Sequence, residues 1–240
     1  MRENAGHAST GSGPDPMKRR PRSPARKVSA PAAGQVRVIG GRWRGTRLPV
    51  PAVEGLRPTP DRVRETLFNW LAPVIPGARV LDLFAGSGAL GLEALSRGAA
   101  AATLVERDPG AVAGLRALVQ RLQGGEAVGV VQADAIQWLR GSASEAFDIA
   151  FVDPPFASGL LQPALDGVLP LVAPDGWLYV EGPPEASLDL PAGWHLHREG
   201  RTRETRFLLY RRDAGGGMPG APVATLPAGP EATPAADTET

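Results

Sequence analysis

The feature that most constrains the fold is the stretch DLFAGSGALG, Asp82 to Gly91, in which three glycines follow an apolar run. Gly86, Gly88 and Gly91 have the spacing G-x-G-x-x-G. Glycines are needed there because the main chain must turn tightly from a strand into a helix and let a ligand approach its N–H groups. The stretch therefore predicts a strand, a ligand-binding loop and a helix in direct succession.

After this loop, strand-like and helix-like patterns alternate along the chain. The sequence predicts strands at 78–85, 101–107, 127–134, 147–153 and 176–182. It predicts helices at 88–98, 108–125 and 135–141, and a broken helix at 160–172. Residues 193–212 alternate apolar and charged side chains, which is typical of two antiparallel edge strands. Together these patterns indicate an α/β fold, with a mostly parallel sheet covered by helices on both faces.

The segment before the glycine loop has a different pattern. Residues 35–51 alternate apolar and basic side chains around glycines, which predicts a β-hairpin. A helix is expected to follow, with Thr59 as its N-cap and Pro60 at its first position. No Asp or Glu occurs from Pro16 to Val53, a window that holds ten lysines and arginines. Such a block is either a solvated basic tail or an arm that contacts nucleic-acid phosphates.

Both ends of the chain differ in composition from its middle. Residues 1–34 and 213–240 are dominated by small, polar or proline residues and hold few large apolar side chains. We therefore expect two disordered tails, the first one basic, around a single domain at 35–212. The absence of cysteine excludes disulfides and thiolate chemistry. No apolar run long enough for a membrane span or a signal peptide is present, and we expect a cytoplasmic protein.

Acidic residues at three predicted strand ends suggest which ligand the glycine loop binds. Glu106 stands where an acid can hold ribose hydroxyls, which suits a dinucleotide as well as a nucleoside. Asp82, just before the glycines, is placed to meet a cationic amino group, and Asp134 to meet an adenine edge. An acidic rim tolerates the sulfonium cofactor S-adenosylmethionine better than a diphosphate. We therefore expect S-adenosylmethionine, with Phe84, Gly86 and Gly88 also contributing to its site.

The predicted strand at 147–153 ends on Asp153-Pro154-Pro155-Phe156. Asp-Pro often begins an ordinary turn, but at a buried strand end beside a ligand loop it favours chemistry. An exocyclic amine becomes a better nucleophile when acceptors hold both of its hydrogens, and Asp153 with the carbonyl of Pro154 would supply them. The two prolines fix the backbone, and Phe156 would stack on a flipped base. Methyl transfer by direct displacement is the expected reaction.

Several segments together resemble the RsmD family of bacterial 16S rRNA (guanine-N2)-methyltransferases. They are RVIGGRWRGTRLPVP, GLRPTPDRVRETLFNWL, LDLFAGSGALGLEALSRGA, VERD and FVDPPF, within residues 36–211. The resemblance implies a seven-stranded Rossmann-like methyltransferase fold with an RNA-facing hairpin. It implies methylation of one guanine in a hairpin loop of the small-subunit head, on an assembled or partly assembled subunit. It also places Arg62, Arg64 and Glu65 on a helix that closes over the cofactor.

We therefore expect a monomeric enzyme that acts on 16S rRNA within the small subunit and needs no metal or membrane. The residues expected to contact RNA are Arg37, Arg42, Trp43, Arg44 and Arg47. Trp43 has an equally good interpretation as a packing residue. Four alternatives remain open: an adenine-N6 DNA methyltransferase, a protein glutamine methyltransferase, a non-catalytic RNA-binding assembly factor and a nicotinamide-dependent oxidoreductase.

Overall fold

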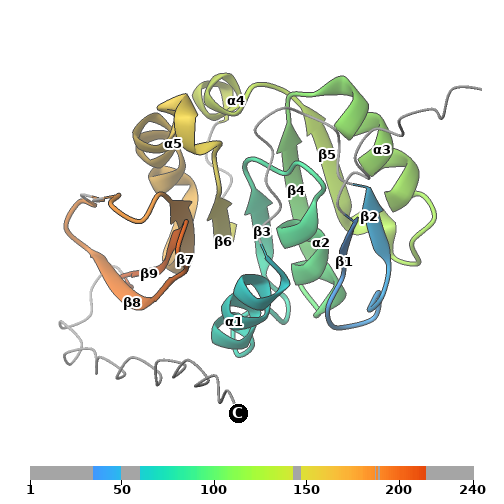
Figure 1. The fold of residues 1–240 in the computed structure, drawn as a ribbon, viewed down its shortest axis with the longest axis horizontal. Helices are drawn as coiled ribbons and strands as arrows, with labels where there is room; N and C mark the ends of the chain where they lie inside the picture. Colours follow the sequence, from blue (N-terminus) through green and yellow to red (C-terminus); the bar gives the residue numbers. More distant parts are fainter. Residues whose placement is uncertain (1–34, 50–59, 143–146, 187, 189, 215–240) are drawn as a thin grey trace, which may run out of the picture. The chain divides into compact units, whose positions relative to one another are not determined.

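A computed structural model describes residues 35–49, 60–142, 147–186, 188 and 190–214 (Figure 1). Of the tails predicted at 1–34 and 213–240, the first lies outside the described residues, and so does the second beyond residue 214; the expected N-cap Thr59 is also outside them. A seven-stranded sheet with the order β5-β4-β3-β6-β7-β9-β8 forms the centre of the described part. Within that part no helix is both long and apolar enough to cross a membrane.

The strands of this sheet lie close to the predicted positions. Their bounds are β3 Arg79–Asp82, β4 Ala101–Glu106, β5 Val128–Gln132, β6 Phe147–Val152, β7 Val172–Gly182, β8 Trp194–Arg201 and β9 Arg206–Arg212. The first five are parallel, whereas β9 pairs antiparallel with both β7 and β8. β7 begins earlier than predicted because Val172 pairs with Phe147 across a register shift. The mostly parallel sheet with an antiparallel edge confirms the predicted fold class.

The helices are α1 Asp61–Leu71, α2 Ala89–Ser96, α3 Pro109–Val119, α4 Ala135–Gly141 and α5 Leu161–Val168. α1 begins at Asp61, so Pro60 precedes the helix and does not occupy its first position as predicted. The expected broken helix is α5 followed by a single 3-10 turn at Leu169–Leu171. Predicted helix bounds were therefore correct to within about two residues, except that α3 ends at Val119, six residues before the predicted end.

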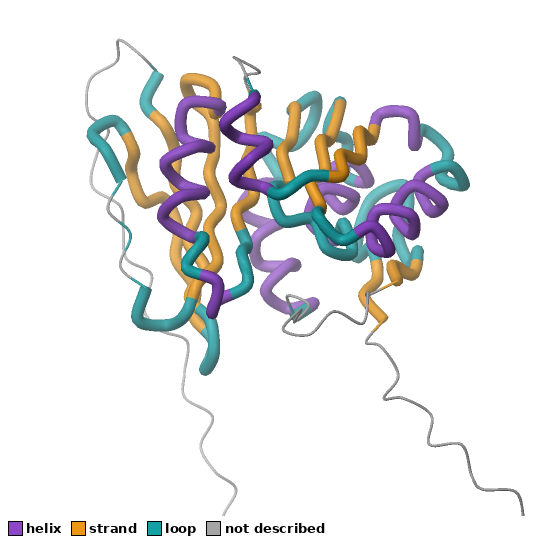
Figure 2. The backbone as a smooth tube through the Cα atoms, turned by 90° about the horizontal axis from the view of Figure 1, so that it is seen from above, coloured by secondary structure: helices purple, strands orange, loops and turns teal. Residues whose placement is uncertain are grey.

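Helices cover both faces of the sheet (Figure 2), and two apolar layers hold them there. On one face, α1, α2 and α3 pack against side chains such as Val80, Leu104 and Phe151. On the other face, α4 and α5 pack against alternate residues of the same strands, such as Leu81, Val105 and Val152. Successive strand residues point to opposite faces, so a strand buried on both faces reads as a continuous apolar run.

The chain returns to the middle of this sheet between β5 and β6. From β3 it proceeds outward to β4 and β5, and then crosses back to place β6 on the other side of β3. The strand order therefore reverses between β3 and β6. In open α/β sheets, ligands bind in the crevice at the carboxyl ends of the strands where the order reverses. Both the glycine loop and the Asp-Pro-Pro-Phe motif follow strands at this position.

Candidate active site and hairpin surface

The glycine loop has the backbone geometry that its sequence predicts. Gly86 and Gly88 have φ values of 52° and 74°, a region that side chains with a Cβ disfavour. Gly91 serves a different purpose, since a Cβ there would lie 2.9 Å from Leu104 and 3.2 Å from the Asp82 Cβ. The first two glycines thus shape the loop, and the third lets α2 approach β3 and β4.

Asp82, the last residue of β3, is a buried carboxylate beside this loop. Its Oδ2 accepts the N–H of Gly91 at 2.9 Å, and its residue is 3% exposed. Burial raises the pKa of Asp82 from 3.8 to about 7, the bond from Gly91 lowers it, and the charge of Glu106 raises it. A cationic ligand group would favour the ionised form. The contact of Asp82 with the amino group of S-adenosylmethionine stays a prediction, with which this buried carboxylate is compatible.

Glu106 and Asp134 also lie at strand ends, and both already bond to the main chain. Glu106 accepts the N–H of Gly86 at 2.8 Å and that of Asp108 at 2.7 Å, so its carboxylate fixes the glycine loop. Asp134 caps α4 by accepting the N–H of Gln137 at 3.0 Å. The sequence did not assign these roles. A carboxylate has about four acceptor positions, so the predicted contacts with ribose and adenine stay compatible with them.

The Asp-Pro-Pro-Phe motif follows β6 at the same edge of the sheet. Pro154 is buried and Pro155 exposed, and the Pro155 carbonyl accepts the N–H of Ser158 at 3.0 Å. The hydrogen bond of this short turn is accepted by the Pro155 carbonyl. It does not involve the Pro154 carbonyl, which is the predicted acceptor for the substrate amine. Among the described residues, Phe156 is the large hydrophobic side chain that stays exposed, at 46%. An exposed ring beside a carboxylate is suited to stacking on a base.

The predicted hairpin is present but is mostly irregular. β1 Gln35–Arg37 and β2 Arg47–Pro49 pair antiparallel, with Val36 opposite Leu48. Val36, Val38 and Leu48 belong to the same apolar layer as α1 and α2. Four arginine side chains of the hairpin are exposed: Arg37, Arg42, Arg44 and Arg47. The hairpin thus combines an apolar inner side with a basic outer side.

Trp43 is a packing residue, which was one of the two interpretations of its sequence position, and its burial does not support the predicted contact with RNA. It is 6% exposed, and its Nε1 donates to the carbonyl of Gln123 at 3.0 Å. The Arg42 guanidinium lies 4.5 Å from the Trp43 ring centroid. A ring enclosed in this way cannot stack on a base. The alternation of apolar and basic residues gave no signal for this, because Trp suits both environments.

Glu93 of α2 anchors the hairpin, a structural role that sequence reasoning missed. Its carboxylate accepts the N–H groups of Ile39 at 2.6 Å and Gly40 at 2.8 Å, and so fixes the hairpin to α2. Arg97 Nε lies 2.6 Å from the same carboxylate, and Arg64 Nη1 lies 3.9 Å from it. Glu93 and Arg64 side chains are both fully buried. The available signal was a single acid inside the otherwise apolar run GALGLEALS.

Arg64 and Arg62 of α1 have different environments. Arg64 is buried and pairs with Asp61 at 2.6 Å as well as with Glu93, so it joins α1 to the hairpin anchor. Arg62 and Glu65 are exposed. The described structure gives Arg64 a structural role, while the role of Arg62 toward a cofactor stays a prediction.

A known protein family matches most of this chain. The family described as Conserved hypothetical protein 95 matches residues 36–211. The ribosomal RNA small subunit methyltransferase D of Escherichia coli K12 is 49% identical over 198 residues, which cover 80% of this chain and 97% of that protein. The protein of the same name from Haemophilus influenzae is 40% identical over 78% of this chain and 99% of its own length.

Solved structures of two relatives have a fold similar to that of this chain. The E. coli protein yhhF is 49% identical, with a TM-score of 0.66 over 75% of this chain and 99% of that one. The H. influenzae protein HI0767 is 36% identical, with a TM-score of 0.64 over 75% of this chain and 99% of its own. Both matches extend over nearly the whole of the solved chains.

Proposed function

Because the chain belongs to the RsmD family of methyltransferases, we propose that it transfers a methyl group from S-adenosylmethionine to the exocyclic N2 of one guanine in 16S rRNA. The substrate is the rRNA of an assembled or partly assembled small subunit. The observation that carries this proposal is the position of Asp153 and Phe156 beside the glycine loop, at the point where the strand order reverses.

The residues of the cofactor site match the chemical groups of S-adenosylmethionine. Asp82 meets the cationic amino group, Gly86 and Gly88 let the ligand approach the main chain, and Glu106 accepts the ribose hydroxyls. Asp134 and Phe84 are assigned to the adenine side. Family membership favours this cofactor over a dinucleotide. When bound, it supplies a methyl group on a positively charged sulfur, which accepts the bonding electrons when the methyl is transferred.

The chain's own contribution to the reaction is to orient and activate the amine. Asp153 accepts one N–H of the guanine N2 and the carbonyl of Pro154 accepts the other, so the nitrogen lone pair points at the methyl carbon. Phe156 stacks on the flipped base and holds its plane. Asp153 is placed to receive the proton that N2 loses. Orientation supplies most of the rate, because direct displacement needs no covalent enzyme intermediate.

The exposed arginines of the hairpin are assigned to RNA phosphates. Arg37, Arg42, Arg44 and Arg47 form a basic surface on a folded support rather than on a free arm. Phosphate contacts orient an RNA without reading its sequence. The fixed hairpin would therefore set which segment of the RNA reaches Phe156.

Comparing several acceptors tests this function. The purified protein is incubated with radiolabelled S-adenosylmethionine and, separately, small subunits from cells without this enzyme, protein-free 16S rRNA, large subunits and duplex DNA. Label in the small subunits, or in their free rRNA, is the expected result. Label in DNA would favour the adenine-N6 alternative, and label in ribosomal protein would favour amide methylation. Transfer to the large subunit alone would contradict the assigned substrate.

A further inference from the structure

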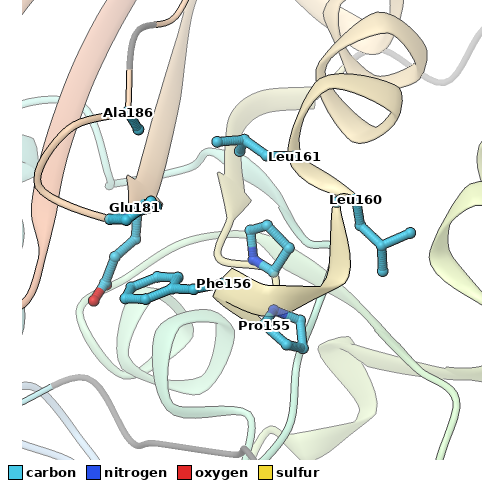
Figure 3. Close-up of a pocket in the computed structure, with 10 residues that line it drawn as sticks. Pro155, Phe156, Leu160, Leu161, Glu181 and Ala186 are labelled. Carbon is cyan, nitrogen blue, oxygen red and sulfur yellow. The ribbon is translucent and has the colours of Figure 1, made fainter.

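A small pocket adjoins the Asp-Pro-Pro-Phe motif and contains a carboxylate that the mechanism above does not use. The pocket has a volume of about 110 Å³ and lies between the end of β7 and the start of α5. Pro154, Phe156, Leu161 and Glu181 are among its lining residues. Figure 3 shows the Glu181 side chain beside the Phe156 ring. A base stacked on Phe156 would therefore have Glu181 next to its edge.

The sheet register sets the distance between Glu181 and the catalytic motif. Val152 of β6 pairs with Val180 of β7 in a parallel ladder, so Asp153 and Glu181 each follow the last matched pair. Neighbouring strands lie about 4.8 Å apart. The main chains at Asp153 and Glu181 therefore lie next to one another at this edge of the sheet, and both carboxylates act on the same residue, Tyr179.

Tyr179 holds the Glu181 side chain in place. Its hydroxyl donates to Glu181 Oε2 at 2.9 Å, and both residues are buried. Burial raises the pKa of Tyr179 well above its usual value, and the charges of Glu181 and Asp153 raise it further. The phenol therefore keeps its proton and remains a donor. A carboxylate has about four acceptor positions, so this bond is compatible with Glu181 accepting an N–H from a ligand.

We propose that Glu181 selects guanine by accepting its N1–H while Asp153 and Pro154 hold N2. This inference rests on the proposed function. In guanine, N1 and the N2 amine are attached to the same carbon, so two adjacent acceptors that follow β6 and end β7 match two adjacent donors. Adenine carries no hydrogen at its ring N1 and presents a lone pair there. A carboxylate facing that lone pair is repelled, and neither group has a donor to offer.

This assignment gives the motif a specificity that it lacks alone. Asp-Pro-Pro-Phe can orient an amine on either guanine or adenine, whereas an acceptor for N1–H suits guanine. A buried acceptor left without its donor loses the whole of that bond, so sites of this kind reject the wrong partner strongly. Glu181 thus acts as a specificity-determining residue on the strand next to the catalytic motif.

Substituting both the side chain and the base tests the proposal. Small subunits are reconstituted from ligated 16S rRNA with either guanine or 2-aminopurine at the position that the wild-type enzyme methylates. 2-Aminopurine keeps the 2-amino group but has a lone pair at N1. Glu181→Gln replaces one carboxylate oxygen by an N–H donor of the same shape. Glu185→Gln, an exposed acid on the following loop, is the matched control.

We expect the wild type and Glu185→Gln to prefer guanine. Glu181→Gln should lose about 10- to 100-fold in kcat/KM on guanine, the range for one hydrogen bond to a charged group. It should lose much less on 2-aminopurine, because its amide N–H can donate to N1. S-adenosylmethionine affinity, measured by calorimetry, should stay unchanged and so confirm that the variant is folded.

The possible outcomes distinguish a failure of this inference from a failure of the proposed function on which it rests. An equal loss on both bases, or a loss of cofactor affinity, would show that Glu181 is only structural and would overturn the inference. No loss on guanine would overturn it as well. If the wild type itself placed no methyl on guanine N2, the proposed function would fail before the variant was considered.

Discussion

A Cβ atom at Gly41 would lie 1.8 Å from the carbonyl oxygen of Ser96, so the hairpin contacts α2 more closely than any other residue allows. Ser96 also accepts the N–H groups of Arg42 and Trp43, through its carbonyl oxygen and its Oγ respectively. The exposed arginines therefore occupy fixed positions relative to the glycine loop. We expect Gly41→Ala to displace the hairpin, lowering RNA affinity while leaving S-adenosylmethionine affinity nearly unchanged.

Gly45→Ala is the matched control for this substitution. Both glycines have positive φ, 73° at Gly41 and 85° at Gly45, but a Cβ at Gly45 would meet no atom within 4 Å. Gly45→Ala should lower the free energy of unfolding only through the strained positive φ, by about 1 to 3 kcal/mol. Urea unfolding and filter binding of labelled rRNA measure the two effects. Equal losses in the two variants would mean that close packing on Ser96 is unimportant.

Removing the buried acid of α2 should destabilise the protein strongly. Glu93→Ala removes the buried charged partner of Arg64, which keeps only the exposed Asp61, and it removes the acceptor for the N–H groups of Ile39 and Gly40. Breaking a buried ion pair in this way costs about 3 to 5 kcal/mol. Chemical denaturation measures the change, with the exposed Glu126→Ala as the control. A loss below about 1 kcal/mol would contradict the anchoring role.

The buried Asp82 carboxylate should lower the stability of the folded protein and strengthen cofactor binding. Its pKa is about 7 in the folded protein and 3.8 as a free group, so between these values the folded state binds more protons than the unfolded state. Stability should therefore fall as pH rises from about 4 to 7. Asp82→Asn removes this titration and keeps an acceptor for Gly91. We expect the variant to be more stable than the wild type at pH 8, by on the order of 2 to 4 kcal/mol.

The same substitution should weaken S-adenosylmethionine binding, because the amide carries no charge for the amino group. Wild-type affinity should fall as pH drops below about 7, where Asp82 takes up a proton. Calorimetry from pH 6 to 7.5 checks both statements. A wild-type affinity that stays constant over this range, or a variant that binds as tightly as the wild type, would remove Asp82 from the cofactor site.

The basic outer side of the hairpin should determine the salt dependence of RNA binding. We expect Arg44→Glu combined with Arg47→Glu to weaken rRNA binding and to reduce the slope of log K against log salt. Each lost phosphate contact reduces that slope by about 0.7 to 0.9. Arg140→Glu, an exposed residue at the end of α4, serves as the control. A slope change in the control equal to that of the double variant would indicate a general charge effect.

The sequence predicted those parts of the molecule that follow local patterns. Glycine spacing and apolar periodicity are local signals, so they predicted the glycine loop, the five parallel strands and the strand-end acids. The roles of Trp43 and Glu93 could not be predicted in this way. They depend on contacts with residues distant in sequence, namely Gln123, Arg64 and the hairpin main chain. Glu181 was also overlooked, because only the pairing of β6 with β7 places it beside Asp153.

The proposed mechanism depends on Asp153 activating the N2 amine of a guanine. The most direct test is digestion of rRNA after reaction with isotopically labelled S-adenosylmethionine, followed by mass spectrometry of the nucleosides. The wild type should yield labelled N2-methylguanosine at one site. Asp153→Ala should bind the cofactor normally but transfer methyl at least about 100-fold more slowly, as expected when amine orientation is lost. Label on another nucleoside, or near-native turnover by Asp153→Ala, would contradict the account.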